Sequence, residues 1–221
     1  MEDFMLDVTA EERVFYGDRL ILLEGIIWEF LTCVTMIRRY QVSLGRGDPV
    51  TSCQARIKRA GSMREKLRLH GLPVAADSAL RDVRDAAGVR LISSFTDDIY
   101  RTAGLLRQIP GVRVEGEKDY VHAPKPNGYR SYHMVLTMPL RFLAEAPEHP
   151  VWLEVQIRTI AMDCWANIEH QLKYKREIAH QKLIVQELKR CADEMISTDL
   201  SLQTIRDLLG PEGGEAVPCG S

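Results

Sequence analysis

Two isolated acidic residues, Asp85 and Glu154, lie near groups of cations in this sequence. Asp85 comes just before a run that reads as a strand, and Glu154 lies inside another such run. Carboxylate oxygens are preferred ligands of Mg²⁺, which commonly shares them with the phosphates of a substrate. The pattern predicts magnesium-dependent phosphoryl chemistry, although an acid placed like Asp85 is also a common helix cap or turn former.

A strongly basic segment covers residues 56–68. It carries six basic residues and one acid, which gives a local net charge of +5. If the chain is extended at residues 56–58, Arg56 and Lys58 point the same way, because side chains alternate across a strand. Both could then reach one anion. A solvated basic surface is the ordinary alternative.

A helix is predicted to follow from about Ser62 to Gly71, because Ser62-Met-Arg-Glu has the form of a capping box. Its first turn would present free amides and the positive end of the helix dipole, and Lys66 lies one turn beyond Ser62 on the same face. Together with Arg56 and Lys58, these residues have the composition of a phosphate cradle.

The stretch of residues 125–133, Lys-Pro-Asn-Gly-Tyr-Arg-Ser-Tyr-His, combines a turn signal with rings and cations. Asn127-Gly128 favours a hairpin turn between two strands. Cations interleaved with aromatic rings suit a nucleotide, because a ring stacks on the base while cations meet phosphate. The residues concerned are Lys118, Tyr120, Lys125, Tyr129, Arg130 and His133. Ordinary packing of Tyr129 and a cross-strand role for His133 are the alternatives.

A strand is predicted over residues 151–157, with strict alternation continuing through Arg158. One face is aliphatic, and the other carries Trp152, Glu154, Gln156 and Arg158. The second face is either solvent-exposed or a binding floor, and its mixture of charges, amide and ring favours a floor. In the helix that follows, the spacing by four predicts burial of Ile160, Cys164, Ile168 and Leu172. Asp163 is then a surface residue or faces the same site as Arg158.

The remaining pattern predicts an α+β fold, with a mixed sheet of about five strands flanked by helices. Expected helices cover residues 11–40, 62–71, 98–109, 159–175 and 178–209, and expected strands cover 89–93, 112–114, 131–138 and 151–157. We divide the chain into an N-terminal helical region (1–48), a core (49–176), a long C-terminal helix for oligomerisation (177–209) and a disordered tail (210–221).

Composition narrows the class of protein. The 221 residues carry a formal net charge of −2, which gives no general reason to expect binding to DNA or a membrane. The five cysteines are scattered without zinc-ligand spacing, as expected in a reducing cytoplasm. No secretory leader is recognisable, and the apolar run at residues 20–37 contains Glu24 and Glu29, so we expect a soluble helix there.

Four motifs in order resemble the synthetase domain of the stringent-response Rel family, over about residues 50–176. They are Arg-x-Lys-x-x-x-Ser-x-x-x-Lys at 56–66, Asp-x-Ala-Gly-x-Arg at 85–90, Lys-Asp-Tyr with Pro-Lys-x-Asn-Gly-Tyr-x-Ser-x-His at 118–133, and Glu-x-Gln-Ile-Arg-Thr with Trp-Ala-x-x-Glu-His at 154–170. Length and flanking helices make the chain most similar to the small alarmone synthetases. No Rel-type hydrolase domain precedes the motifs, so hydrolysis is expected to be absent.

The resemblance implies a nucleotidyltransferase-like synthetase fold and a GTP diphosphokinase, which transfers pyrophosphate from ATP to the 3′-hydroxyl of GTP or GDP. It implies ATP binding by Arg56, Lys58, Ser62, Lys66 and Arg90. It implies Mg²⁺ on Asp85 and Glu154, with Glu154 taking the proton of the hydroxyl. The acceptor nucleotide would meet Lys118, Lys125, Asn127, Tyr129, His133, Gln156 and Asp163. Asp163 stands where some relatives have asparagine, and as an acceptor of hydrogen bonds it would favour guanine.

Other functions stay open at this level. Relatives with nearly the same core pyrophosphorylate tRNA 3′ ends or adenine nucleotides, and a catalytically silent nucleotide- or RNA-binding regulator is a third possibility. The resemblance also implies a homotetramer formed through the N- and C-terminal helices, with possible regulation by (p)ppGpp or single-stranded RNA.

Overall fold

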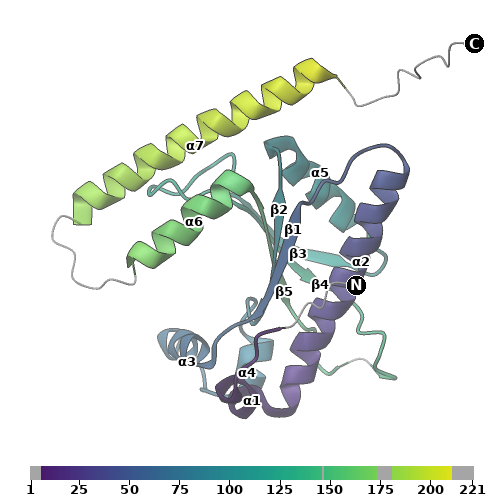
Figure 1. The fold of residues 1–221 in the computed structure, drawn as a ribbon. Coiled ribbons are helices and arrows are strands. Elements are labelled where there is room, and N and C mark those ends of the chain that lie inside the picture. The colour runs from purple at the N-terminus through teal and green to yellow at the C-terminus, as the bar shows by residue number, and fades with distance from the viewer. Residues whose placement is uncertain (1–5, 146, 174–180, 211–221) are drawn as a thin grey trace, which may run out of the picture.

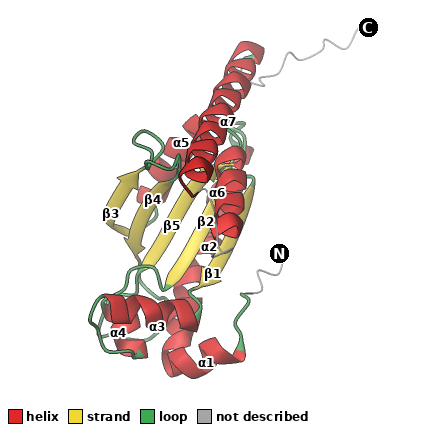
Figure 2. Ribbon diagram, turned by 90° about the vertical axis from the view of Figure 1, so that its left-hand side faces the viewer, coloured by secondary structure: helices red, strands yellow, loops and turns green. Residues whose placement is uncertain are grey.

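A computed structural model describes residues 6–145, 147–173 and 181–210. Its centre is a five-stranded mixed sheet, which confirms the predicted fold class (Figures 1 and 2). The strand order is β1-β2-β5-β4-β3, and the β2–β5 pair is parallel while the other pairs are antiparallel. The strands are β1 (Ser52–Ile57), β2 (Ala87–Ser93), β3 (Arg113–Asp119), β4 (Tyr132–Thr137) and β5 (Leu153–Thr159).

One face of the sheet is apolar and is covered by helices α2 (Leu20–Ser43) and α5 (Thr96–Arg107) (Figure 1). Ile26, Ile27 and Phe30 of α2 are completely buried there, as are Leu153, Val155 and Ile157 of β5. The segment Ala10–Ser43 is the only described one that could span a membrane by length and hydropathy. In this fold its apolar side chains at residues 26, 27 and 30 belong to the protein core.

The N-terminal helix is not continuous, so the prediction of one helix over residues 11–40 was wrong. Helix α1 (Ala10–Tyr16) ends at Gly17, whose φ of 50° is a conformation that favours glycine. A short 3-10 turn, η1 (Gly17–Arg19), then leads into α2. This break lets α1 lie beside α3 instead of extending α2 (Figure 2).

Helix α3 (Ala60–Leu69) begins two residues before the predicted capping serine, Ser62, which is exposed in the first turn. The cap comes from another helix, because the Glu12 carboxylate accepts a hydrogen bond from the Ala60 backbone N at 3.0 Å. A short helix, α4 (Ala76–Arg81), was not predicted. Six residues are too few to show a helical period.

Strand β3 is longer than the predicted segment 112–114 and lies at the edge of the sheet. Its sequence, Arg-Val-Glu-Gly-Glu-Lys-Asp, is mostly charged and contains a register shift between Val114 and Gly116. Charged side chains and bulges are common at sheet edges, where they discourage pairing with other chains. The hydrophobic pattern therefore gave no signal for most of this strand.

Helices α6 (Ile160–Lys173) and α7 (Gln181–Leu209) lie on the opposite side of the sheet from α2 (Figure 1). The predicted buried row of α6 was wrong: Ile160, Cys164, Ile168 and Leu172 are all exposed. The helix instead buries Met162, Asp163, Trp165, Ala166 and Glu169, because it packs a partly polar face over the polar side of the sheet. The predicted start of α7 at residue 178 and the predicted disordered tail after residue 210 lie outside the described residues.

Candidate active site

The strand register places polar side chains from all five strands in one row across the sheet. Paired positions run from Gln54 on β1 to Arg90 on β2 and Gln156 on β5, then to His133 on β4 and Lys118 on β3. Directly paired residues share a face of a sheet, so the row forms one surface. A second row contains Arg56, Gly88 and Glu154. Residues separated by up to about a hundred positions in sequence therefore lie together.

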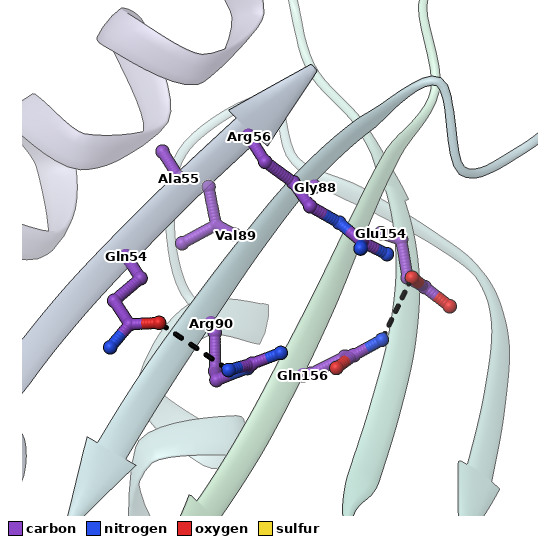
Figure 3. Close-up of a pocket in the computed structure, with 8 residues that line it drawn as sticks. All are labelled: Gln54, Ala55, Arg56, Gly88, Val89, Arg90, Glu154 and Gln156. Atoms are coloured by element: carbon purple, nitrogen blue, oxygen red, sulfur yellow. Dashed lines mark hydrogen bonds between the residues drawn. The ribbon is translucent and has the colours of Figure 1, made fainter. Parts of the chain in front are cut away.

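A pocket opens on this face where the two rows cross β1, β2 and β5 (Figure 3). Gly88 lies at its floor without a side chain, and Arg56 extends across it toward Glu154 (Figure 3). A Cβ at residue 88 would touch the Arg56 side chain at 3.6 Å and the Glu154 carbonyl oxygen at 3.8 Å. These are ordinary van der Waals distances, so the Arg56 side chain packs directly over residue 88 on its way to Glu154. The lining residues are Gln54, Ala55, Arg56, Gly88, Val89, Arg90, Glu154 and Gln156.

Asp85, in the turn before β2, is held between two lysines. Its Oδ2 lies 2.8 Å from Nζ of Lys58 and 2.9 Å from Nζ of Lys66. Burial acts to raise the pKa of Asp85, but these two ammonium groups outweigh it and lower the pKa overall. The other oxygen, Oδ1, is buried and has no hydrogen-bond partner among the residues that the structure describes. One side of this carboxylate is therefore neutralised and the other remains available.

Glu154 is the second acid of the site, and both of its oxygens have partners. Oε2 accepts a hydrogen bond of 3.0 Å from Nε2 of Gln156, and Oε1 lies 3.4 Å from Nδ1 of His133. Burial and the nearby charge of Asp85 raise the pKa of Glu154, but the His133 and Gln156 contacts lower it overall. Glu154 is consequently charged and oriented toward the pocket.

The two acids fit a magnesium ion bound together with substrate. Among the described residues, no group of three or more His, Cys, Asp or Glu side chains could hold a metal by itself. Mg²⁺ in phosphoryl-transfer sites is held by one or two carboxylates plus phosphates and waters. The buried, unpartnered Oδ1 of Asp85 matches such a ligand, and Glu154 lies close enough for the two charges to interact.

The segment after β3 forms the expected turn, with a φ of 92° at Gly128. Lys125 places its Nζ 4.7 Å from the Tyr120 ring centre and 4.8 Å from that of Tyr129. Tyr129 meets Tyr120 and His133 edge to face. Both polar atoms of the Asn127 side chain are engaged, because its Nδ2 donates to Oε1 of Glu169 on α6 at 3.1 Å and its Oδ1 accepts from the backbone N of Tyr129 at 3.2 Å. In this structure Asn127 fixes the turn to α6.

Arg158 is a residue of this site that the sequence-based set omitted. Only 4% of its side chain is exposed, and its Nη1 donates to Oδ1 of Asp163 at 3.0 Å. Its Nη2 donates at 2.8 Å to both the Tyr129 hydroxyl and Oε1 of Gln156. The alternation of the strand had already put Arg158 on the polar face, but nothing in the sequence showed that it would be enclosed by its neighbours.

Asp163 lies beside Arg158 in this structure, and its contact with a guanine base stays a prediction. Its Oδ1 pairs with both Arg90 and Arg158 at 3.0 Å, and its Oδ2 accepts from Nδ2 of Asn167 at 3.0 Å. Arg90 also donates to Gln54 at 3.3 Å, while burial and the nearby Arg158 lower its pKa. Both oxygens of Asp163 are thus already engaged by the protein.

A mixed sheet with acids and cations aligned on one open face defines a nucleotidyltransferase-like synthetase domain. The chain belongs to the RelA/SpoT family, because the profile of the region found in RelA and SpoT proteins matches residues 55–179. The GTP pyrophosphokinase YwaC of Bacillus subtilis is 40% identical over 146 residues, which are 66% of this chain and 69% of that protein. GTP pyrophosphokinase YjbM of the same organism is 33% identical over 159 residues, 72% of this chain and 73% of that protein.

Solved structures agree with this assignment. Small alarmone synthetase 2 from B. subtilis superposes with a TM-score of 0.76 at 31% identity, covering 87% of this chain and 98% of that one. Small alarmone synthetase 1 from B. subtilis, bound to its product pppGpp, superposes with a TM-score of 0.77 at 28% identity, covering 87% and 97%. The family resemblance expected from the four motifs is therefore confirmed.

Proposed function

We propose that this protein is a (p)ppGpp synthetase that transfers the β,γ-pyrophosphate of ATP to the 3′-hydroxyl of GTP or GDP. The main support is the pocket in which Glu154 lies among the cations of β1 and β2, with an aromatic loop beside it. Structures of small alarmone synthetase 1 from B. subtilis bound to AMPCPP and to pppGpp share this fold. In the reaction, the acceptor oxygen bonds to the β-phosphorus while the bond from that phosphorus to the α-phosphate oxygen breaks, releasing AMP.

The donor phosphates would bind at Arg56, Lys58 and Lys66, near the first turn of α3, which carries Ser62. A phosphate entering between the two lysines would compete for them with Asp85, because both now contact that single oxygen. Arg90 would add a contact to the donor from the neighbouring strand. Phosphoryl transfer depends mainly on charge neutralisation and in-line positioning, which such a set of cations provides.

The acceptor would lie beside the loop that carries Tyr129. Its base would stack on the Tyr129 ring, which requires Lys125 to move from its position 4.8 Å above that ring. Lys125, Lys118 and His133 would then face the acceptor's phosphates or ribose, and Gln156 would orient the acceptor. Asn127 would act through its bond to α6, which holds the turn in place.

Glu154 would accept the proton of the 3′-hydroxyl. It is charged in the substrate-free protein and lies at the pocket's edge beside Arg56. Mg²⁺ bound by Asp85 and Glu154 would neutralise charge on the transferring phosphates. The orientation of Glu154 is set by the chain itself, through Gln156 and His133.

We propose further that the protein is cytoplasmic and forms a homotetramer through its N- and C-terminal helices. Supporting this, α2 exposes Ile21, Trp28 and Met36, and α7 exposes Leu200, Ile205 and Leu208. Light scattering at micromolar concentration should give about four times the chain mass of 25.1 kDa. A monomeric mass would contradict this part of the proposal.

The function is tested by incubating the protein with γ-labelled ATP, Mg²⁺ and one acceptor at a time: GDP, GTP, ATP or tRNA. Label should appear in a guanosine product with GDP or GTP. Label appearing only in tRNA, or only with an adenine acceptor, would contradict the proposal. Glu154→Gln should abolish transfer by removing the base, and a variant that kept the full rate would overturn the assigned mechanism.

A further inference from the structure

Five side chains of the site form a closed circuit of contacts around Glu154. The Tyr129 hydroxyl lies 2.8 Å from Nε2 of His133, whose Nδ1 lies 3.4 Å from Glu154. Gln156 donates to Glu154 at 3.0 Å and accepts from Arg158 at 2.8 Å. Arg158 closes the circuit by donating to the Tyr129 hydroxyl, also at 2.8 Å. The circuit joins the aromatic loop, β4 and β5.

Hydrogen-bond chemistry gives this circuit a direction. Arginine only donates, so the hydroxyl oxygen of Tyr129 and Oε1 of Gln156 must both accept from Arg158. The Tyr129 proton is then free to point at Nε2 of His133, and in that arrangement the ring keeps its own proton on Nδ1, which faces the Glu154 carboxylate. In this arrangement both arms start at Arg158 and deliver a donor to Glu154.

We propose that Arg158 is a positioning residue for the transfer, which orients Glu154 through Tyr129 and His133 on one side and through Gln156 on the other. This inference rests on the proposed function for its kinetic part only. Arg158 does not contact the pocket, and 96% of its side chain is buried. Its planar fork suits the task, because one terminal nitrogen donates to two partners while the other is fixed by Asp163.

The direct test is the tautomer of His133, measured by ¹⁵N NMR of histidine-labelled protein at pH 8.5 without substrate or metal. His133 is assigned by comparison with a His133→Gln variant among the six histidines. A neutral ring protonated on Nδ1 is expected, although free histidine in water favours Nε2. Tyr129→Phe removes the donor to Nε2 and should return His133 to the Nε2-protonated form. An Nε2-protonated ring or an imidazolium in the unsubstituted protein would overturn the proposal.

The kinetic test asks whether Arg158 orients Glu154 or only balances the charge of Asp163. Arg158→Met should lower kcat by roughly 10- to 100-fold, as expected when a group supporting a catalytic ligand is lost. The KM for ATP should change by less than about 2-fold, because Arg158 pairs directly with none of the described donor-site residues and is linked to Arg90 only through Asp163. Asp163 keeps its 3.0 Å pair with Arg90 in this variant, which favours folding. Equal losses in kcat and in ATP binding would contradict the proposal.

The Arg158→Lys variant tests whether the role of Arg158 needs the planar guanidinium group or only its positive charge. A lysine restores the positive charge beside Asp163 but cannot donate along both arms in the same geometry. We expect it to recover thermal stability relative to Arg158→Met without recovering kcat. Recovery of kcat to within about 2-fold of the unsubstituted protein would show a merely structural role. Arg38→Met, which removes the partner of Asp48 from α2, is the matched control and should leave kcat unchanged.

If the unsubstituted protein makes no guanosine product, the proposed function fails. The tautomer measurement still shows whether the hydrogen bonds of the circuit run in the proposed direction. If the product forms but His133 is protonated on Nε2, the proposed function stands and the positioning role of Arg158 fails. The two proposals are thus tested independently.

Discussion

The carboxylate of Glu12 accepts a hydrogen bond of 3.0 Å from the backbone N of Ala60, the first residue of α3. The same helix α1 supplies Tyr16, whose hydroxyl donates to the carbonyl oxygen of Lys58 at 2.7 Å. Arg59 pairs with Glu12 at 3.0 Å, and Arg64 pairs with Glu11. Helix α1 thus fixes the backbone of the basic segment 56–68 and neutralises two of its six basic residues, Arg59 and Arg64.

Replacing Glu12 by glutamine should destabilise the protein and weaken donor binding. Loss of hydrogen bonds to a charged group costs about 1.5–3 kcal/mol of the free energy of unfolding. The KM for ATP should rise more than the KM for GTP, because α3 carries Lys66. Urea unfolding and steady-state kinetics check both results. Glu11→Gln, which removes only an exposed pair, is the control, and an equal effect from it would contradict the assignment.

The lowered pKa of Glu12 predicts that the stability of the protein depends on pH. Burial acts to raise the pKa of Glu12, but hydrogen bonds from Thr9, Ala60 and Arg59 outweigh it and lower the pKa from 4.5 to about 2. A depressed pKa in the folded state stabilises the protein above pH 4.5, and this contribution is lost as pH falls toward 2. The difference in unfolding free energy between the unsubstituted protein and Glu12→Gln should therefore shrink over this range. A difference that stays constant from pH 7 to pH 3 would argue against it.

Gly128→Ala should disturb the loop of residues 125–133, beside which we propose that the acceptor binds. Its φ of 92° disfavours any side chain, and a Cβ there would lie 2.7 Å from Cβ of Ala192 on α7. We expect a loss of at least about 1 kcal/mol in stability and a higher KM for GTP. Gly104→Ala in α5 is the matched control, because a Cβ there meets nothing within 4 Å. It should stabilise the helix by about 0.5–1 kcal/mol. Equal behaviour of the two variants would contradict the close approach of α7 to residue 128.

Asp163→Asn should act on stability more than on the choice of base. The substitution leaves Arg90 and Arg158 without their shared countercharge, and breaking a buried pair in this way costs about 3–5 kcal/mol. Asp97→Asn breaks the exposed pair with Arg206 and should cost no more than about 1 kcal/mol. Denaturant unfolding compares the two variants. A large change in the ratio of guanine to adenine acceptors with unchanged stability would instead support direct contact of Asp163 with the base.

Magnesium should bind appreciably only together with a nucleotide. Lys58 and Lys66 already neutralise one oxygen of Asp85, and the described residues contain no cluster of three metal-binding side chains. Calorimetric titration of the nucleotide-free protein with Mg²⁺ should give no heat of binding at micromolar to low millimolar concentrations. Titration after addition of a non-hydrolysable ATP analogue should give a signal that Asp85→Asn removes. Tight binding without nucleotide would show a preformed metal site.

Sequence patterns indicated which residues share a face of one strand better than they indicated which strands are neighbours. The alternation of β5 placed Glu154, Gln156 and Arg158 on one face, which their side-chain hydrogen bonds confirm. Their neighbours across the sheet depend on register, and a sequence of alternating residues does not specify which strands pair. For the same reason nothing indicated that Arg90 and His133 would flank Gln156.

Two local patterns gave wrong predictions because a tertiary contact replaced the expected one. Ser62 does not cap α3. The cap is Glu12, whose almost completely buried carboxylate accepts from the backbone N of Ala60, 48 residues further along the chain. In α6 the apolar row and the buried row both have helical spacing, so periodicity alone cannot choose between them. The buried row is the one containing Asp163 and Glu169, whose partners lie on other elements.

The central parallel pair of β2 and β5 joins Gly88 to Glu154, positions 66 residues apart in the chain. Parallel strands cannot pair through a short turn, and contacts between distant positions form slowly because a long loop must close first. Arg56, Lys58 and Lys66, which we propose bind ATP, are translated well before Glu154. A nascent chain that ends before β5 therefore carries these cations but lacks the proposed catalytic acid, so we expect activity only after the whole sheet has assembled.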